Sequence, residues 1–147
     1  MKRKALVLSV VALVFANAEC GDVVKDDVAK LQGSWKLLQY VERGIGTHKD
    51  ELEFIEVVFK GSNFEIKTPG GTGKKGTFKL DPAQKPPRID LFGGDKKPAP
   101  GVYTFDGASL KICLPSGPNI IKGVRPTDFS STKENGYTLM VLERKKN

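Results

Sequence analysis

The chain passes from a short polar helix into a long apolar strand at Leu31-Gln32-Gly33-Ser34-Trp35-Lys36-Leu37. Gly33 allows the backbone to turn here without a Cβ clash. Trp35, the only tryptophan of the chain, stands at the start of the strand, where its ring can plug one end of a closed sheet. Most of the chain that follows has the alternating apolar and polar residues of β-strands. We therefore expect this stretch to form the floor of a barrel.

Residues 1–18 have the pattern of a secretory signal peptide, with the basic start Lys2-Arg3-Lys4, an apolar run over 5–15 and small residues before the cleavage site. The apolar run is shorter than the roughly 20 residues that span a bilayer. We therefore favour a cleaved leader over a retained membrane anchor. The mature domain, 19–147, is expected to have no stable membrane span and to be secreted or periplasmic.

The two cysteines are Cys20 and Cys113. Cys20 lies beside the expected cleavage site, as in lipid-anchored bacterial proteins, but Glu19 is neither small nor neutral, so we favour the unanchored form. In an oxidising compartment the two thiols could form a disulfide, which would contribute about 4–5 kcal/mol on the chain-entropy model. No pattern brings them within bonding distance, so bridged and free cysteines both remain open.

The charge of the mature chain is modest. The leader carries three of the 24 basic residues and none of the 17 acidic ones, which leaves an excess of four positive charges. Basic and acidic residues are interspersed, a pattern that keeps a domain soluble. Because no basic stripe with interleaved aromatic residues is present, we expect no nucleic-acid partner.

The alternation pattern predicts eight strands after a short helix. The helix is expected over 22–31, and the strands over 34–43, 54–60, 63–68, 77–81, 88–92, 101–105, 108–114 and 137–144. In the first strand, Trp35, Leu37, Gln39 and Val41 are expected on one face and Tyr40 on the other. The segment 115–136 is too long for a structureless loop in a compact domain, so it should have structure of its own.

Three hairpins follow from registers that satisfy both faces of the sheet at once. Their turns are predicted at Gly61-Ser62, at the proline-bearing loop 82–87 and at Asp106-Gly107. The expected cross-strand pairs are Glu56–Lys67, Val57–Ile66, Phe59–Phe64, Phe78–Leu91, Lys79–Asp90, Leu80–Ile89 and Asp81–Arg88. The third hairpin should point Phe105, Leu110, Ile112 and Leu114 inward and Lys111 and Cys113 outward.

Eight antiparallel strands joined by neighbouring hairpins predict an all-β, up-and-down barrel with a short N-terminal helix. An opened sandwich is the alternative fold. At this strand number the interior is either filled by side chains or holds one small ligand.

The chain resembles the lipocalin-like domain family that is abundant in planctomycete bacteria. The matching motifs are Leu31-Gln32-Gly33-Ser34-Trp35, Gly76-Thr77-Phe78-Lys79-Leu80-Asp81-Pro82, Lys85-Pro86, Ile89-Asp90-Leu91, Gly101-Val102-Tyr103, Asp106-Gly107, Leu110-Lys111-Ile112-Cys113 and Arg125-Pro126-Thr127-Asp128-Phe129. The resemblance implies a lipocalin-type barrel in which Gly33, Trp35 and Arg144 form the floor, with Arg144 over the Trp35 ring as a cation–π cap. It implies no reaction, because that family has no established catalytic residues.

No catalytic or metal-binding pattern is apparent in the sequence, so we expect a protein that is not an enzyme and has no cofactor or metal. His48, the only histidine, stands alone in a polar connection. The glycine-rich run 69–75 does not lead from a strand into a helix, as phosphate-binding loops do, and is expected to be a loop.

The barrel interior supplies the candidate ligand-binding residues. These are Phe59, Phe64, Phe78, Tyr103 and Phe105, which could line an apolar pocket or fill the core. Tyr103 would be the polar anchor of a ligand, because a buried hydroxyl needs a partner. Arg125-Pro126-Thr127-Asp128-Phe129 could form part of a ligand entrance, or Phe129 could pack over the mouth while Arg125 bonds loop carbonyls.

The predicted function is that of an exported, non-enzymatic, lipocalin-like domain that binds a small apolar ligand. The alternative is a structural or protein-interaction module of the cell envelope with a packed core and an envelope protein as its partner. The two differ in whether the barrel has interior volume.

Overall fold

The computed structural model describes residues 19–71, 73–94 and 97–146, with the backbone alone at Glu19 and Cys20. The predicted signal peptide, 1–18, lies outside the described residues. The helices are α1 (Glu19–Leu31), α2 (Lys49–Leu52) and α3 (Pro118–Lys122). The strands are β1 (Gly33–Glu42), β2 (Ile45–Gly46), β3 (Glu56–Lys60), β4 (Asn63–Lys67), β5 (Lys75–Asp81), β6 (Arg88–Phe92), β7 (Ala99–Asp106), β8 (Ser109–Pro115) and β9 (Tyr137–Arg144).

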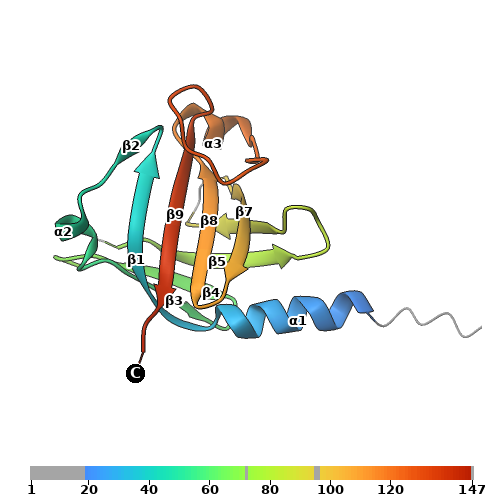
Figure 1. Ribbon diagram of the computed structural model, residues 1–147. Helices are drawn as coiled ribbons and strands as arrows, with labels where there is room; N and C mark the ends of the chain where they lie inside the picture. Colours follow the sequence, from blue (N-terminus) through green and yellow to red (C-terminus); the bar gives the residue numbers. More distant parts are fainter. Residues whose placement is uncertain (1–18, 72, 95–96, 147) are drawn as a thin grey trace, which may run out of the picture.

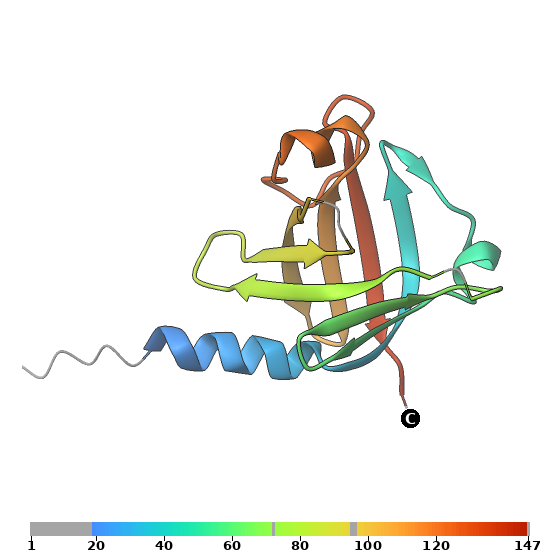
Figure 2. The ribbon, with the colours of Figure 1, turned by 180° about the vertical axis from the view of Figure 1, so that it is seen from behind.

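The strands form one antiparallel sheet in the order β2-β1-β3-β4-β5-β6-β7-β8-β9, and β1 also pairs with β9. This last pairing closes eight strands into a barrel, and the two-residue β2 is an extra strand at the far end of β1 (Figures 1 and 2). The predicted all-β, eight-stranded antiparallel barrel with a short N-terminal helix is confirmed, and the opened sandwich is excluded. Its connections run between neighbouring strands, and the pairing of β1 with β9 removes the two edges that an open sheet would have.

The predicted registers of the first two hairpins are confirmed. Phe59 lies opposite Phe64, and Leu80 lies opposite Ile89. The third turn is shifted by one residue from the prediction: Asp106 pairs with Ser109, so the turn residues are Gly107-Ala108. Gly107 has φ +58, which glycine adopts without strain. The inward face of this hairpin is unchanged by the shift.

Both charge pairs predicted outside the second hairpin have the predicted register, Lys79 opposite Asp90 and Asp81 opposite Arg88, but neither forms an ion pair among the described residues. Lys79 does lie opposite Asp90, but Asp90 Oδ1 is 2.7 Å from Arg125 Nη2, an ion pair without hydrogen-bond alignment. Asp81 instead accepts a hydrogen bond of 3.1 Å from Gln84. The register is therefore set by the inward apolar pairs and not by these charges.

A β-bulge in β1 changes the predicted inward face of its second half. The register against β9 shifts between Leu37, opposite Leu142, and Gln39, opposite Val141, so Leu38 is the extra residue. Beyond it Tyr40 pairs with Met140 and packs against the core. The prediction that Gln39 and Val41 share the face of Trp35 is wrong for this reason.

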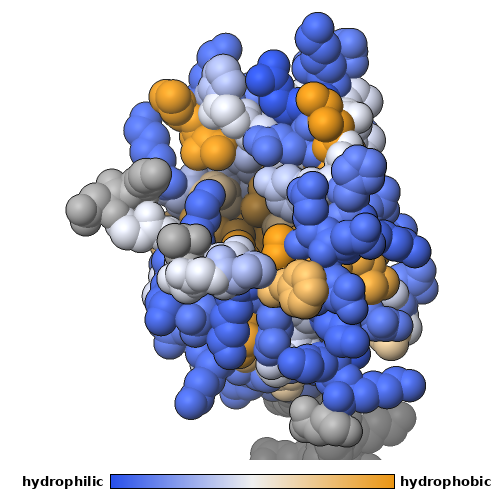
Figure 3. Space-filling model, turned by 90° about the vertical axis from the view of Figure 1, so that its left-hand side faces the viewer, coloured by the Kyte–Doolittle hydropathy of each residue, from blue (hydrophilic) through white to orange (hydrophobic). Residues whose placement is uncertain are grey.

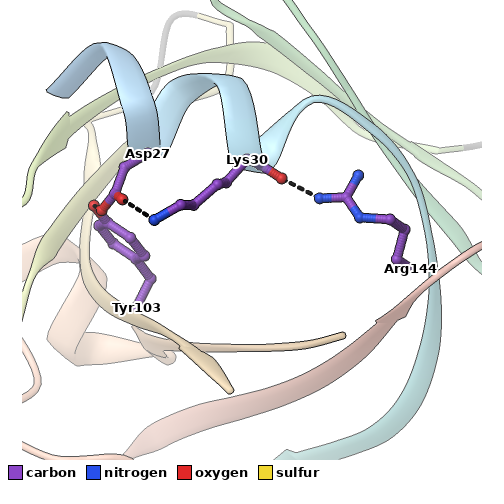
Figure 4. A network of polar contacts seen from close by, with 4 residues as sticks. All are labelled: Asp27, Lys30, Tyr103 and Arg144. Carbon is purple, nitrogen blue, oxygen red and sulfur yellow. Dashed lines mark hydrogen bonds and ion pairs between the residues drawn. The ribbon is translucent and has the colours of Figure 1, made fainter. Parts of the chain in front are cut away.

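The floor of the barrel is where Trp35 meets the end of α1. Trp35 is 1% exposed, and its indole Nε1–H donates to the Leu31 carbonyl at 2.9 Å. The Arg144 guanidinium lies 4.4 Å from the centre of the ring, which confirms the predicted cation–π cap. It also donates to the carbonyls of Gln32, at 2.8 Å, and Lys30 (Figure 4). These carbonyls have no helical partner, and a cation at a helix C-terminus is stabilising.

Gly33 makes this arrangement possible. Its φ is +110, in the left-handed region, and a Cβ there would approach Arg144 Nη1 to 3.4 Å. A larger residue would strain the backbone at the point where helix and strand join.

The segment 116–136 has structure of its own, as predicted. It contains α3 and a turn in which the Thr132 carbonyl accepts from the Gly136 N–H at 3.2 Å. The same segment covers Cys113, whose Sγ lies 3.5 Å from the Ser130 carbonyl oxygen. Cys113 and Ile112 point to opposite faces of β8. Cys113 is on the outer face, as predicted, but it is fully buried.

The structure describes the side chain of only one of the two cysteines, so it does not test the disulfide. Cys113 is a free thiol beneath the covering segment, and the side chain of Cys20 lies outside the described residues. A disulfide to Cys20 would require that segment to move away, and the bridge stays a prediction.

Truncation of Trp35 tests the floor. Trp35→Ala should lower the free energy of unfolding by about 3–5 kcal/mol, because it removes a buried large aromatic ring. Arg144→Ala should lower it by about 2 kcal/mol through the loss of charged hydrogen bonds. Leu38→Ala, at a 43%-exposed position on the same strand, is the control and should have little effect. Denaturant unfolding measures all three, and an unchanged midpoint for Trp35→Ala would contradict the assignment.

Candidate functional site

The five aromatic residues predicted for the interior all belong to the core of the barrel or pack against it, and four of them form two ring contacts. Phe59 meets Phe78 edge-on at 5.3 Å between ring centres, and Tyr103 meets Phe105 at 5.7 Å. Phe105 is also 6.4 Å from the Trp35 ring. Phe59, Phe64, Phe78 and Tyr103 are buried, and Phe105 packs against the same core. In the half of the barrel near the floor, these rings therefore fill space.

Tyr103 already has a protein partner for its hydroxyl. The O–H donates to Asp27 Oδ2 at 2.6 Å, and Lys30 Nζ is 3.6 Å from the other carboxylate oxygen (Figure 4). Burial, together with this bond to Asp27, raises the pKa of Tyr103 well above its usual range. The expectation that Tyr103 anchors a ligand is therefore replaced by a structural role, because its hydroxyl holds α1 against the barrel.

The opposite end of the barrel is open. A pocket of about 810 Å³ lies beside the β1–β2 hairpin and the turn around Thr132. It is lined by Tyr40, Glu42, Arg43, Gly44, Ile45, Thr47, Ser131, Thr132 and Lys133. None of the five predicted aromatic residues is among them. Viewed from the side of α2, the molecule has a hollow with apolar side chains at its base (Figure 3).

A hydrogen-bonded cluster of polar side chains stands at this open end. The Ser116 hydroxyl donates to Glu42 Oε1 at 3.1 Å and lies 2.5 Å from the Thr138 hydroxyl. Tyr40 donates to the other oxygen of Glu42 at 3.5 Å. Ser116 and Thr138 are 3% and 6% exposed, whereas Tyr40 is half-buried and Glu42 is exposed, so the cluster runs from the wall of the barrel to its surface. Burial, and then the negative charge of Glu42, raise the pKa of Tyr40.

The bulge explains why the sequence did not indicate this cluster. Strict alternation along β1 puts Tyr40 and Glu42 on the outer face, and the extra residue Leu38 turns both toward the interior. A bulge has no reliable sequence signal, although the apolar pair Leu37-Leu38 breaks the alternation at this point.

A second depression, of about 480 Å³, lies along β3, β4 and β5 and is lined in part by Lys60, Glu65 and Thr77. These residues are exposed or partly exposed side chains of the strands. This depression does not involve the rim of the barrel, so its residues serve below as matched controls.

The segment Arg125-Pro126-Thr127-Asp128-Phe129 does not line the pocket. Arg125 donates to the Gly101 carbonyl of β7 at 2.8 Å and pairs with Asp90 of β6, so it ties the segment to the outside of the sheet. The alternative expectation is that Arg125 donates to loop carbonyls. It does donate to a backbone carbonyl, but this carbonyl belongs to strand β7. Phe129 is half-buried.

Within the described residues, no three His, Cys, Asp or Glu side chains gather as a metal site would require. His48 is exposed at the start of α2. Burial, with a smaller effect of Asp128, raises the pKa of the Cys113 thiol to about 12, so this cysteine is protected from thiolate chemistry. The helices in the described part of the chain are too short or too polar to cross a bilayer.

The chain matches no family model, no curated protein and no solved structure. Its resemblance to the planctomycete lipocalin-like family therefore remains a hypothesis from the sequence motifs. The fold itself is a β-barrel that is compatible with lipocalin-like ligand binding.

The pH dependence of stability tests the role of Tyr103. Because its pKa is raised in the folded state, the folded protein keeps this proton when the unfolded chain loses it near pH 10. The contribution of Tyr103 to the free energy of unfolding is therefore complete below pH 10. Above pH 10 it decreases by about 1.4 kcal/mol per pH unit.

Urea unfolding between pH 10.5 and 11.5 measures this slope. The Tyr103→Phe variant should be less stable than the wild type at pH 7, by about 1–2 kcal/mol, and should have a shallower slope in the alkaline range. Equal slopes for the two proteins would contradict the burial of this hydroxyl against Asp27.

Proposed function

We propose that the protein is an exported, non-enzymatic, lipocalin-like domain that binds a small, largely apolar ligand at the open end of its barrel. The observation that supports this most directly is the pocket of about 810 Å³ at the end opposite the Trp35 floor. Small-molecule sites commonly have volumes of about 300–1,000 Å³. A barrel with one sealed end and one open end can hold such a ligand.

Apolar side chains at the open half of the barrel supply the surface for the ligand. Ile55, Ile66, Leu91 and Leu114 lie near the strand ends on this side, pack against the core and remain partly exposed, although they are not part of the pocket lining itself. Burial of such surface by a ligand is favourable by about 25 cal/mol per Å². The apolar part of the ligand is proposed to lie against these residues, with the Tyr40–Glu42 cluster beside its polar part.

The other parts of this proposal are supported by the sequence. The signal-peptide pattern of 1–18 supports export to a secreted or periplasmic location, and the motif order supports membership of the lipocalin-like family. The non-enzymatic role is supported by the pocket lining, in which Glu42 is the one carboxylate among the described residues and already accepts two hydrogen bonds.

The alternative function is a structural or protein-interaction module of the cell envelope. The observation that favours it is the close packing of the aromatic residues near the floor, which leaves that half of the barrel filled. The two proposals differ in whether the open end takes up a small molecule.

Titration with N-phenyl-1-naphthylamine, a neutral fluorescent probe, tests the binding proposal. The wild type should bind it saturably with a stoichiometry of one. Thr47→Trp adds bulk to the pocket lining and should weaken binding at least tenfold, whereas Thr77→Trp, in the outer depression, should leave it unchanged. Absence of binding, or equal binding by both variants, would favour the interaction module.

A further inference from the structure

Two cations stand at the rim of the open pocket. Arg43 is in the turn between β1 and β2, and Lys133 is in the turn that follows α3, and both line the pocket. The two turns are held together, since the Gly44 N–H donates to Ser131 Oγ at 3.1 Å. A Cβ on Gly44 would lie only 3.4 Å from the backbone nitrogen of Lys133. The two cationic residues are therefore on adjacent segments of one rim.

Neither cation is neutralised within the described part of the chain. The ion pairs found there join Lys30, Lys75, Arg125 and Lys145 to acidic partners, and neither Arg43 nor Lys133 takes part. Two acidic residues lie nearby in the sequence. The carboxylate of Glu42 accepts hydrogen bonds from the Ser116 and Tyr40 hydroxyls, which hold it in place without removing its charge, and Glu134 is exposed beside Lys133. Neither carboxylate forms an ion pair with Arg43 or Lys133 in the described part of the chain. Two like charges on one pocket rim favour an anion between them.

The backbone of Arg43 gives a second, independent observation. Its φ is +51, and it is the one non-glycine residue with a positive φ among the described residues. Glu42 pairs with Ile45, so Arg43 and Gly44 are the two central residues of a tight turn, and Gly44 also has a positive φ, +81. Such turns are most stable with Asn, Asp or Gly at the first central position.

An arginine in this place stabilises the turn less than asparagine would. Strained backbone of this kind tends to occur at functional sites, where the side chain has a role that offsets the strain. The planar guanidinium is the group that binds a carboxylate or a phosphate with two parallel hydrogen bonds. The two cations on the rim and the strained backbone at Arg43 thus both point to a binding role for the Arg43 side chain.

We propose that the ligand of this pocket is an amphipathic anion whose carboxylate or phosphate is held at the rim by Arg43 and Lys133, while its apolar part lies in the barrel. This rests on the proposed function and adds the chemical class of the ligand. Thr47 and Thr132 also line the pocket, and the O–H of Thr132, whose oxygen accepts from the Asn135 N–H at 3.1 Å, can donate to the anion.

Calorimetric titration with four ligands of one chain length tests the proposal: decanoate, decyl phosphate, decanol and decyltrimethylammonium, each below its micelle concentration. At least one of the two anions should bind at least tenfold more tightly than decanol, and the stronger of them identifies the head group. The cation should bind no more tightly than decanol. The preference for the anion should decrease as the salt concentration rises.

Three variants assign the effect to the rim. Arg43→Asn and Lys133→Gln should each reduce the preference for the anion to threefold or less, and Arg43→Asn should also raise the melting temperature because it relieves the turn. Lys60→Gln, in the outer depression, removes the same charge from a different surface and should keep the preference.

The outcomes separate this inference from the proposed function. If all four ligands fail to bind, the binding function itself is wrong. If they bind with equal affinity, or if the anion preference survives in Arg43→Asn and Lys133→Gln, the function stands and the role of the two cations is overturned.

Discussion

The guanidinium of Arg144 is the contact on which the rest of the barrel depends. It lies 4.4 Å from the Trp35 ring and donates to the carbonyls of Lys30 and Gln32, so one side chain joins the last strand, the first strand and the end of α1. The strand pair that closes the barrel, β1 with β9, ends at this contact. Trp35 is thereby buried away from water, and its indole N–H donates a hydrogen bond to the Leu31 carbonyl. The same residue pair, Trp35 and Arg144, therefore takes part both in closing the sheet and in sealing the floor.

The two ends of the barrel differ because of this floor. Near it, the interior is filled by rings in edge-on and tilted contact, and Tyr103 bonds to Asp27 of the helix. At the other end β1 carries a bulge, which turns Tyr40 and Glu42 inward. The hydrogen-bonded cluster of Tyr40, Glu42, Ser116 and Thr138 therefore stands at this open end, beside a pocket of about 810 Å³. This asymmetry is what supports the proposal that a ligand binds at the open end.

The sequence predicts the barrel and its floor well, since apolar alternation and turn residues specify register wherever one face is buried. The pairing of Phe59 with Phe64 and the cap of Arg144 on Trp35 were predictable in this way. The mouth was not predictable, because the bulge at Leu38 and the contact of Gly44 with Ser131 depend on tertiary packing. The five predicted aromatic residues belong to one core, but none of them lines the pocket at the open end.

The most direct test follows the single indole resonance in a ¹⁵N-correlation NMR spectrum while decanoate is added. The account predicts that amide signals of residues 43–47 and 131–133 shift with saturation, while the indole N–H of Trp35, bonded to Leu31 beneath Arg144, does not move. A large shift of the Trp35 indole with unchanged signals at the rim would mean that the ligand enters at the floor. That result would contradict a barrel that is sealed at one end and binds its ligand at the other.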